Sequence, residues 1–329
     1  MGRGYKGEEQ METYYSIHDI LKVKTNIELI KWDRIPNYFK VDEIDEVDLN
    51  IMEGKFDVDF KELRPLGLRL FKGDDFIIYK SHTFGDLKLM IKNLTGNTEL
   101  FFTKNYRIFN GVFELLGFIV WLKFIQKGYT LIHSACVSKN KKGVLLSAWS
   151  DTGKTLTSLS LLQKSFQFLS DDFTLISPNG YAYSYPQIVR KSVFNPFERI
   201  PFLNKLKITK EVNIPEDKID NKAEIDKLFF LEKDRGDAVK EINHEEAVRR
   251  LLITTEDAIN YSSRIINSNT NQILRGYSYL DPRLNLKEMR ERHEDIIKKA
   301  IEKASCFEVK TEKAERFPEL INDFLLNFS

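Results

Sequence analysis

The chain has 329 residues, of which 42% are hydrophobic and 12% aromatic, which is ample for a packed core and excludes a disordered protein. Its 50 basic residues nearly balance 49 acidic ones, so the net charge of +1 gives no support for a nucleic-acid or acidic-membrane partner. Two cysteines and five scattered histidines provide no zinc-binding spacing. This length predicts one large domain or two of ordinary size.

Three features of the sequence predict a soluble, cytoplasmic protein. Cys136 and Cys306 lie far apart, which favours two unpaired thiols in a reducing compartment over a single buried bridge. Residues 1–10 are polar and lack the apolar stretch of a secretory signal. The most apolar stretch, Val112–Ile125, is shorter than the roughly 20 residues that span a bilayer, so it predicts a buried helix and no membrane partner.

The N-terminal third of the chain is broken into short β-rich runs. Val47–Met52, Phe76–Ser81 and Leu87–Ile91 are separated by clusters of Asp, Gly, Asn and Pro. We therefore expect a smaller α+β or mainly β domain over residues 16–110, preceded by a candidate disordered tail over residues 1–15. Because no Gly-rich loop or His cluster stands out in this domain, we assign it to substrate recognition.

A second, α/β domain is expected over residues 111–329. Its apolar run Gly143–Ala148 is typical of a strand buried on both faces of a sheet. Asn243 with Glu246 three residues later is a capping box that begins a helix. The succession of patterns predicts a mixed sheet flanked by helices. In chain order, the expected elements are a bridging helix over residues 112–126, strands over Tyr129–Ser138 and Gly143–Ala148, a helix over Leu156–Gln163, strands over Phe168–Ile176, Tyr181–Tyr185 and Asp226–Glu232, a helix through Ala247–Leu252, and C-terminal helices over Leu286–Lys303 and Lys313–Leu326 with a strand over Phe307–Val309 between them.

The octapeptide Ala148–Thr155, AWSDTGKT, matches a phosphate-binding P-loop except at its first position, where another small residue replaces Gly. It stands between an apolar strand and a helix, as a P-loop does. Gly153 lets backbone N–H groups approach the β-phosphate, Lys154 reaches the β- and γ-oxygens, and the Thr155 hydroxyl can bind Mg²⁺. The predicted binding residues for ATP or another nucleoside triphosphate are Ser150, Asp151, Thr152, Gly153, Lys154 and Thr155.

Two adjacent carboxylates, Asp171 and Asp172, follow the P-loop by one helix length, in the next apolar strand. Carboxylates in such a place are costly unless they face a cation or a solvated cleft, and a P-loop protein provides Mg²⁺ as the cation. We expect one of them to hold the metal together with Thr155, and the other to accept the proton of an attacking hydroxyl. The plainer interpretation is that the pair only starts a turn.

His133 lies one strand before the P-loop, and by alternation it shares a face with Leu131, Ala135 and Val137. This pattern leaves two interpretations open. His133 is either a core histidine with one backbone partner, or it contacts the γ-phosphate or the acceptor.

The order of these motifs closely resembles the HPr kinase/phosphorylase superfamily, whose catalytic fold is shared with phosphoenolpyruvate carboxykinase. The resemblance rests on the strand His133, a Lys/Asn-rich turn, the segment GVLLSAWSDTGKT and the segment FLSDDFTLI. It continues more weakly in Asn179–Pro186, in Leu228–Glu232 with Glu241–Leu252, and in Cys306–Val309. It covers about residues 100–329.

The resemblance implies a kinase-type site. The P-loop would bind the triphosphate and its Mg²⁺, with Lys154 as a catalytic residue, and His133 would lie beside the transferring phosphoryl group as another. Asp171 would be the general base and Asp172 the metal-side carboxylate, and the reverse order stays open. Arg190 or Lys191 is a candidate for neutralising phosphate charge.

The sequence also departs from the family. The segment Val189–Ile200 stands where bifunctional HPr kinase/phosphorylases carry a Gly-rich signature, which counts against HPr as the acceptor and against the phosphorylase reaction. Ala148, Trp149 and Asp151 differ from the usual Gly/Ser-rich loop.

Taken together, the residues predict an ATP-dependent kinase whose acceptor is a protein serine or a small-molecule alcohol. The alternatives are a nucleotide-binding regulatory protein and an NTPase in which water replaces the acceptor. The choice between ATP and GTP stays open. So does a homo-oligomer, which the resembling kinases often form.

Overall fold

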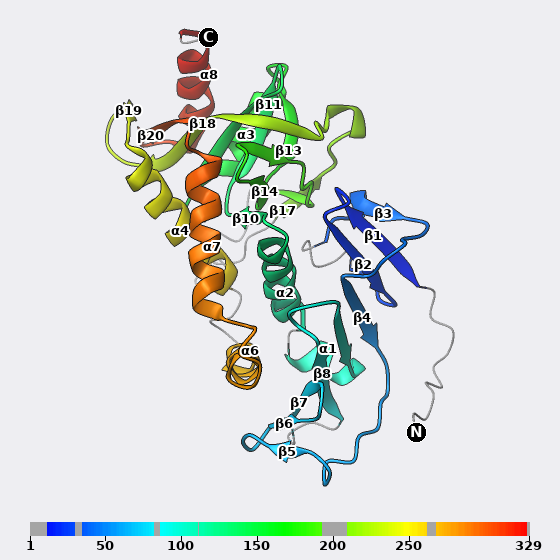
Figure 1. Cartoon of the computed structure of the whole chain (residues 1–329). Coiled ribbons are helices and arrows are strands. Elements are labelled where there is room, and N and C mark those ends of the chain that lie inside the picture. Colours follow the sequence, from blue (N-terminus) through cyan, green and yellow to red (C-terminus); the bar gives the residue numbers. More distant parts are fainter. Residues whose placement is uncertain are drawn as a thin grey trace, which may run out of the picture. The chain divides into compact units, whose positions relative to one another are not determined.

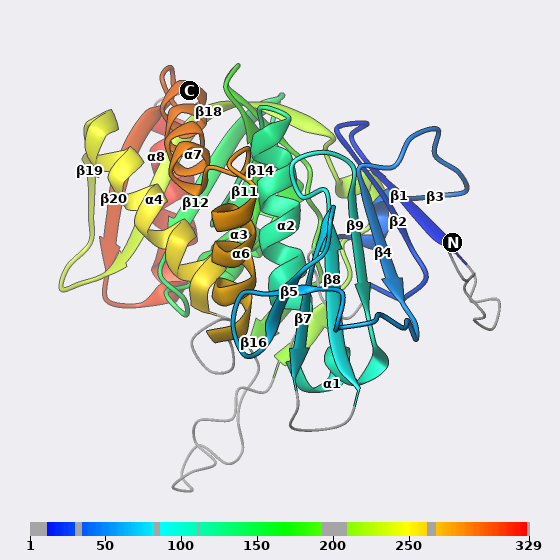
Figure 2. The same ribbon diagram turned by 60° about the horizontal axis from the view of Figure 1, so that its bottom comes forward.

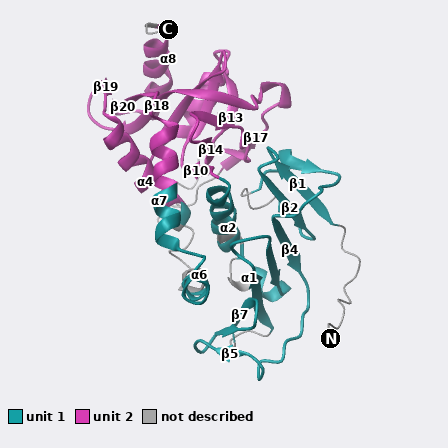
Figure 3. Cartoon of the chain, viewed as in Figure 1, with its two compact units in different colours: residues 1–127, 259–292 teal, residues 128–258, 293–329 magenta. Residues whose placement is uncertain are grey.

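The computed structural model describes residues 12–29, 35–81, 86–110, 112–192, 209–261 and 268–327 (Figure 1). The chain divides into two compact units, one of residues 1–127 with 259–292 and the other of residues 128–258 with 293–329 (Figure 3). This division differs from the predicted boundary at residue 110. The apolar helix of residues 112–126 and the later segment 259–292 both belong to the first unit.

Unit 1 contains a nine-stranded sheet within its described residues, in the order β3-β1-β2-β4-β9-β8-β7-β6-β5. The β2–β4 and β4–β9 pairs are parallel and the remaining pairs are antiparallel. Strand β1 begins at Thr13, inside the predicted tail, whose first eleven residues lie outside the described ones. The elements are β1 Thr13–Ile17, β2 Leu21–Thr25, η2 Asn37–Phe39, β3 Lys40–Val41, β4 Leu49–Glu53, β5 Arg64–Pro65, β6 Leu70–Lys72, β7 Phe76–Ser81, β8 Leu87–Lys92, β9 Thr98–Phe102, α1 Lys104–Asn110, α2 Val112–Gln126 and α6 Ser268–Leu280.

Unit 2 contains a second nine-stranded sheet within its described residues, with the path β10-β14-β15-β18-β12-β11-β13, and with β20 pairing to β18 and β19. The neighbours β12, β18 and β20 run parallel. A separate two-stranded pair is formed by β16 and β17. The elements are β10 Thr130–Ile132, β11 Ala135–Lys139, β12 Lys142–Ala148, α3 Lys154–Leu162, β13 Gln167–Ser170, β14 Thr174–Ser177, β15 Tyr181–Tyr183, β16 Val189–Ser192, β17 Thr209–Val212, η3 Glu216–Lys218, β18 Lys222–Lys233, β19 Ala238–Glu241, α4 His244–Tyr261, α7 Leu286–Ala300, β20 Ser305–Thr311, η4 Ala314–Arg316 and α8 Phe317–Asn327. Two of these helices cross the boundary between the units, because residues 259–261 of α4 and residues 286–292 of α7 belong to unit 1.

The sheet of unit 2 is covered on both faces by helices, which explains the continuous apolar runs in its strands (Figure 2). On one face Leu145 packs among buried residues of α4 and α7. On the other face Val144 and Leu146 pack against α3 and α8. The chain is therefore a mixed α/β protein with large mixed sheets and flanking helices, as the sequence predicts.

Many predicted elements are confirmed. The bridging helix is α2 with the predicted bounds, the strand Phe76–Ser81 is β7, and the amide side chain of Asn243 caps α4 by accepting the Glu246 N–H at 2.8 Å. Cys136 and Cys306 are both free and buried. No helix within the described residues is long and apolar enough to cross a membrane.

Two predicted strands are wrong in the same way, because each is interrupted near its middle. Tyr129–Ser138 divides into β10 and β11, and Phe168–Ile176 divides into β13 and β14. The two halves of each segment pair with different neighbours: β10 pairs with β14, whereas β11 pairs with β12 and β13. His133 is thus not in mid-strand but at an interruption, and its predicted alternation with the flanking residues does not hold.

The two interruptions lie opposite each other in the sheet. Ile132 is the register partner of Thr174, and Cys136 is the register partner of Ser170. The residues between these pairs include His133 on one segment and Asp171–Asp172 on the other. Paired breaks in two neighbouring segments therefore bring the predicted histidine and the predicted carboxylates together.

Candidate active site

The predicted phosphate-binding loop connects β12 to α3 and contains two residues with a positive φ. β12 ends at Ala148 and α3 begins at Lys154. Between them, Asp151 and Gly153 have φ angles of 64° and 128°. A Cβ atom on Gly153 would lie 2.9 Å from the Cβ of Ala314, so both the backbone angle and the space require glycine there. The first N–H groups of a helix lack intrahelical partners and favour an anion.

A pocket of about 700 Å³ opens at this loop, which is within the usual size of ligand pockets. Lys154 and Arg190 line it and give it two positively charged side chains. Trp149 also lines it, with 54% of its surface exposed. The lining residues are His133, Trp149, Ser150, Asp151, Gly153, Lys154, Thr155, Leu156, Asp172, Arg190 and Glu315.

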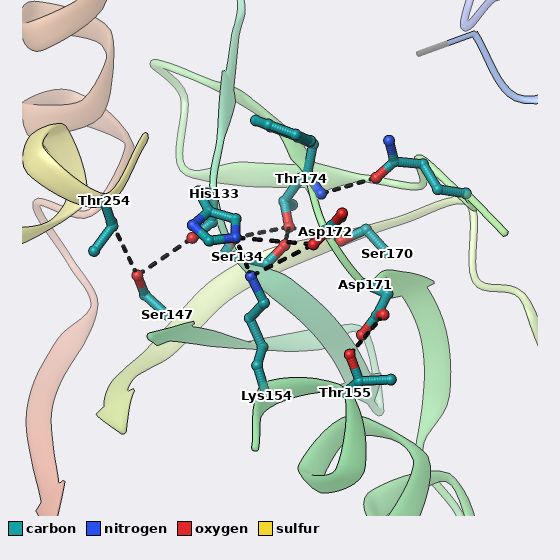
Figure 4. A network of polar contacts seen from close by, with 12 residues as sticks. His133, Ser134, Ser147, Lys154, Thr155, Ser170, Asp171, Asp172, Thr174 and Thr254 are labelled. Carbon is teal, nitrogen blue, oxygen red and sulfur yellow. Dashed lines mark hydrogen bonds and ion pairs between the residues drawn. The ribbon is translucent and has the colours of Figure 1, made fainter. Parts of the chain in front are cut away.

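The ammonium group of Lys154 lies against the His133 imidazole (Figure 4). Its Nζ atom is 2.5 Å from Nε2 of His133 and 3.9 Å from Oδ1 of Asp172. Only 8% of Lys154 is exposed, and burial lowers the pKa of its ammonium, an effect that the carboxylates of Asp172 and Asp171 oppose. A buried cation at the start of a helix and at the edge of a pocket is placed to meet an anionic ligand.

His133 is held at the strand interruption by hydroxyl groups from other elements. Its backbone N–H donates to Oγ1 of Thr255 at 3.0 Å, and its carbonyl accepts from Oγ of Ser147 at 3.3 Å. Burial, followed by the Lys154 ammonium, lowers the pKa of the imidazole. The ring is therefore neutral at neutral pH, and its Nε2 atom accepts a hydrogen bond from Lys154.

Asp171 is buried behind the P-loop and is 6% exposed. It accepts hydrogen bonds from Thr155 Oγ1 at 2.9 Å and from Ser158 Oγ at 3.3 Å. Burial, followed by the neighbouring Asp172 carboxylate, raises the pKa of Asp171 to about 6. A carboxylate beside the Thr155 hydroxyl has the surroundings expected of a metal-side ligand.

Asp172 points the other way, toward His133 and Lys154, and 66% of its side chain is exposed. Its Oδ1 atom lies 3.8 Å from Nε2 of His133. Two hydrogen bonds fix the turn around it: Phe173 N–H donates to Oε1 of Gln187 at 2.9 Å, and the hydroxyls of Ser170 and Thr174 lie 2.6 Å apart. Two adjacent carboxylates thus have different surroundings, one buried against the loop and one open to the pocket.

Most of the predicted residues meet at this one place. All of the predicted nucleotide-binding residues except Thr152 line the pocket, together with His133 and Asp172. Asp171 is not among the lining residues and reaches the site through Thr155. Arg190 lines the pocket and forms a 3.8 Å ion pair with Glu211, whereas the side chain of Lys191 lies outside the described ones.

Sequence reasoning missed the hydroxyl groups that hold these residues in place. Ser158 could have been found, because four residues after Lys154 on a helix it lies on the same side. Thr255 could not have been found, because it is 122 residues away from His133 and no local pattern joins the two.

The residues fit a magnesium ion carried by a nucleotide. Mg²⁺ usually keeps several waters and binds one or two carboxylates besides the substrate phosphates. The Thr155 hydroxyl and the adjacent Asp171 supply such a pair of oxygen ligands, with Asp172 as the next carboxylate. Among the described residues, no group of three or more His, Cys, Asp or Glu side chains could hold a metal alone.

Comparison with known proteins gives distant structural likenesses and no match in sequence. No protein-family model and no curated protein sequence matches the chain. Among solved structures it is similar to the HPr(Ser) kinase/phosphatase from Coxiella burnetii, at 11% identity and a TM-score of 0.29, over 60% of this chain and 95% of that chain. This is a distant structural relationship, and the function proposed below rests on the side chains of the site.

Proposed function

We propose that this chain is an ATP-dependent kinase that transfers the γ-phosphoryl group to a hydroxyl acceptor. The observation that carries the proposal is the meeting of Lys154, neutral His133 and the open carboxylate of Asp172 at one P-loop pocket. A protein that only binds a nucleotide needs the loop and the lysine, but it does not need an exposed carboxylate beside them.

The two aspartates have separate roles, in the reverse of the order first expected. Asp171 and Thr155 would hold the magnesium ion, a role that their hydrogen bond and the burial of Asp171 support. Bound there, Mg²⁺ neutralises charge on the phosphates. Asp172 is the general base, which its exposure to the pocket supports.

In the transfer step, Asp172 accepts the proton of the acceptor hydroxyl. The hydroxyl oxygen forms a bond to the γ-phosphorus while the bond from the γ-phosphorus to the bridging oxygen breaks, so that ADP leaves. Lys154 stabilises the charge on the phosphate oxygens. His133 keeps the Lys154 ammonium group in position by accepting a hydrogen bond from it. Catalysis is then mostly positioning and charge neutralisation.

The acceptor is a protein serine or a small-molecule alcohol. Hydrolysis to free phosphate is the competing outcome, because an exposed Asp172 can activate water as well as an alcohol. A cytoplasmic location belongs to the same proposal, since ATP is available there and both described cysteines are free thiols.

Four outcomes of one assay separate the proposal from its rivals. The purified chain is incubated with γ-labelled ATP or GTP, Mg²⁺, and a panel of alcohols and cell-extract proteins. Label on an acceptor supports a kinase, and label only in free phosphate supports an NTPase. Nucleotide binding without any release of label indicates a regulatory binding protein, and no binding at all refutes the P-loop interpretation.

A further inference from the structure

The P-loop contains a non-glycine residue in a backbone conformation that usually takes glycine. The N–H of Thr152 donates to the carbonyl of Trp149 at 3.3 Å, which closes a turn with Asp151 as its third residue. Asp151 has a φ of 64°. Turns with a positive φ at this position strongly favour glycine, and another residue there costs free energy unless its surroundings compensate. The loop therefore needs a contact that holds Asp151 in place.

Lys233 supplies such a contact from the neighbouring strand. Its Nζ atom donates to the backbone carbonyl of Asp151 at 3.1 Å. Strand β18 runs parallel to β12, and their last paired residues are Leu231 and Ala148. Lys233 therefore lies on β18, two residues beyond the end of this pairing. Lys233 is itself paired with Thr311 of β20, which fixes its backbone. The donor thus comes from a fixed strand end beside the loop.

We propose that Lys233 is a positioning residue that holds the P-loop in its phosphate-binding conformation by fixing the carbonyl of Asp151. This inference rests on the nucleotide site proposed above. A fixed Asp151 carbonyl keeps this turn closed and leaves the following N–H groups, at the start of α3, available to an anion, because neighbouring N–H groups bind anions when they converge. Lys233 acts on the nucleotide through the loop, and no direct contact with a phosphate is required.

The alternative role is a direct one, in which the exposed ammonium group of Lys233 binds a phosphate. Substitutions at residue 151 distinguish the two roles of Lys233. Asp151→Gly relieves the backbone cost, because glycine takes a positive φ freely, and so it makes the contact from Lys233 less necessary. Asp151→Ala removes the same charge but keeps a Cβ atom, which is strained at a positive φ, so it controls for the loss of a negative charge beside the phosphates.

The test is a double-mutant cycle on the full chain, with the dissociation constant for Mg·ADP measured by calorimetry. Lys233→Ala is expected to weaken binding by about three- to tenfold, the value of one net hydrogen bond. The loss should persist in the Asp151→Ala background and largely disappear in the Asp151→Gly background. Lys222→Ala, which removes an exposed lysine from the other end of β18, is the matched control and should bind as the wild type does.

The other outcomes overturn the inference in distinguishable ways. If the wild type binds Mg·ADP and Lys233→Ala binds it equally well, Lys233 does not position the loop, and the proposed function stands. If the loss is the same in all three backgrounds, Lys233 contacts the phosphates directly. If the wild-type chain does not bind Mg·ADP, the nucleotide site itself is refuted.

Discussion

Two buried lysines, one in each unit, have similar burial and different surroundings. Lys123 on α2 of unit 1 is 3% exposed and donates to the carbonyl oxygens of Leu94 and Gly96 and to Oε1 of Gln126. Lys154 of unit 2 contacts an imidazole nitrogen and lies 3.9 Å from a carboxylate. Burial lowers the pKa of both ammonium groups.

The two lysines differ in how many of their ammonium protons remain available to a ligand. The three protons of the Lys123 ammonium are matched by three acceptors from its own unit, and Lys123 does not line the pocket at the P-loop. Lys154 has one close neutral acceptor and borders a 700 Å³ pocket. A buried, perturbed lysine is therefore a marker of function only when its donors are left for something outside the fold.

The largest expected effect is at the carboxylate beside Lys154. Asp172→Asn removes the proposed base, so kcat for phosphoryl transfer should fall by about 10²–10⁴, the usual contribution of general base catalysis. The dissociation constant for Mg·ADP should change little, because in the proposed site the loop, Lys154 and Thr155 bind the nucleotide. Label-transfer rates and calorimetry on the same preparation measure both. A variant that keeps the wild-type kcat would exclude Asp172 as the base.

Replacing each lysine by methionine compares the two sites directly. Lys154→Met should lower kcat by about 10²–10³, as expected when a donor to a developing charge is removed. Lys123→Met should leave the turnover of each folded molecule unchanged, because its ammonium group is occupied within unit 1. Equal losses of turnover in the two folded variants would contradict the distinction between them.

The two substitutions should affect the free energy of unfolding in the opposite order, with the larger loss in Lys123→Met. In Lys123→Met the carbonyl of Gly96 loses its charged donor and keeps only the longer hydrogen bond from the Thr98 hydroxyl, at 3.4 Å. The free energy of unfolding should therefore fall by about 1.5–3 kcal/mol, the value of a hydrogen bond to a charged group. Lys154→Met should be neutral or stabilising, because active-site charges are commonly kept at the expense of stability. Urea denaturation of both variants measures this, and a stability loss confined to Lys154→Met would reverse the assignment.

The pH dependence of stability gives a smaller effect. The pKa of Lys123 falls from 10.5 to about 8 in the folded protein, mainly because of burial. Between these values the unfolded chain holds a proton that the folded chain has released, so this residue makes folding more favourable as pH rises from about 8 to 10.5. The contribution is lost as pH falls through 8.

Lys123→Met should lack this contribution. The difference in unfolding free energy between wild type and variant should grow by up to about 1.4 kcal/mol for each pH unit above 8. Denaturation curves at several pH values from 7 to 10 provide the check. Parallel pH dependences would mean that the pKa of Lys123 is not lowered.

The parts of the site that were predicted from the sequence are local. The P-loop is a contiguous octapeptide, and the pair Asp171–Asp172 follows it by one helix length. The strand Gly143–Ala148 is recognisable because helices on both faces of the sheet require apolar side chains throughout. Short-range patterns such as these are visible in a single sequence.

The parts of the site that the sequence did not predict depend on pairing between distant segments. Nothing local marks the interruption at His133, where neither Gly nor Pro occurs; it arises because β10 and β11 pair with different strands. The adjacent Asp171 and Asp172 are a local turn signal, but they do not show which strands pair on either side of the turn. The different environments of the two aspartates follow from that geometry. The assignment of α2 and residues 259–292 to unit 1 is equally a matter of tertiary contacts.

The central claim is that the pocket around Lys154, His133 and Asp172 transfers a phosphoryl group. The most direct measurement is the transfer of label from γ-labelled ATP to an acceptor by the wild type, Asp172→Asn and Lys123→Met. The account predicts a labelled acceptor with the wild type and with folded Lys123→Met, and at least a hundredfold less with Asp172→Asn. Transfer that is undiminished in Asp172→Asn, or Mg·ATP binding without any transfer or hydrolysis in the wild type, would contradict it.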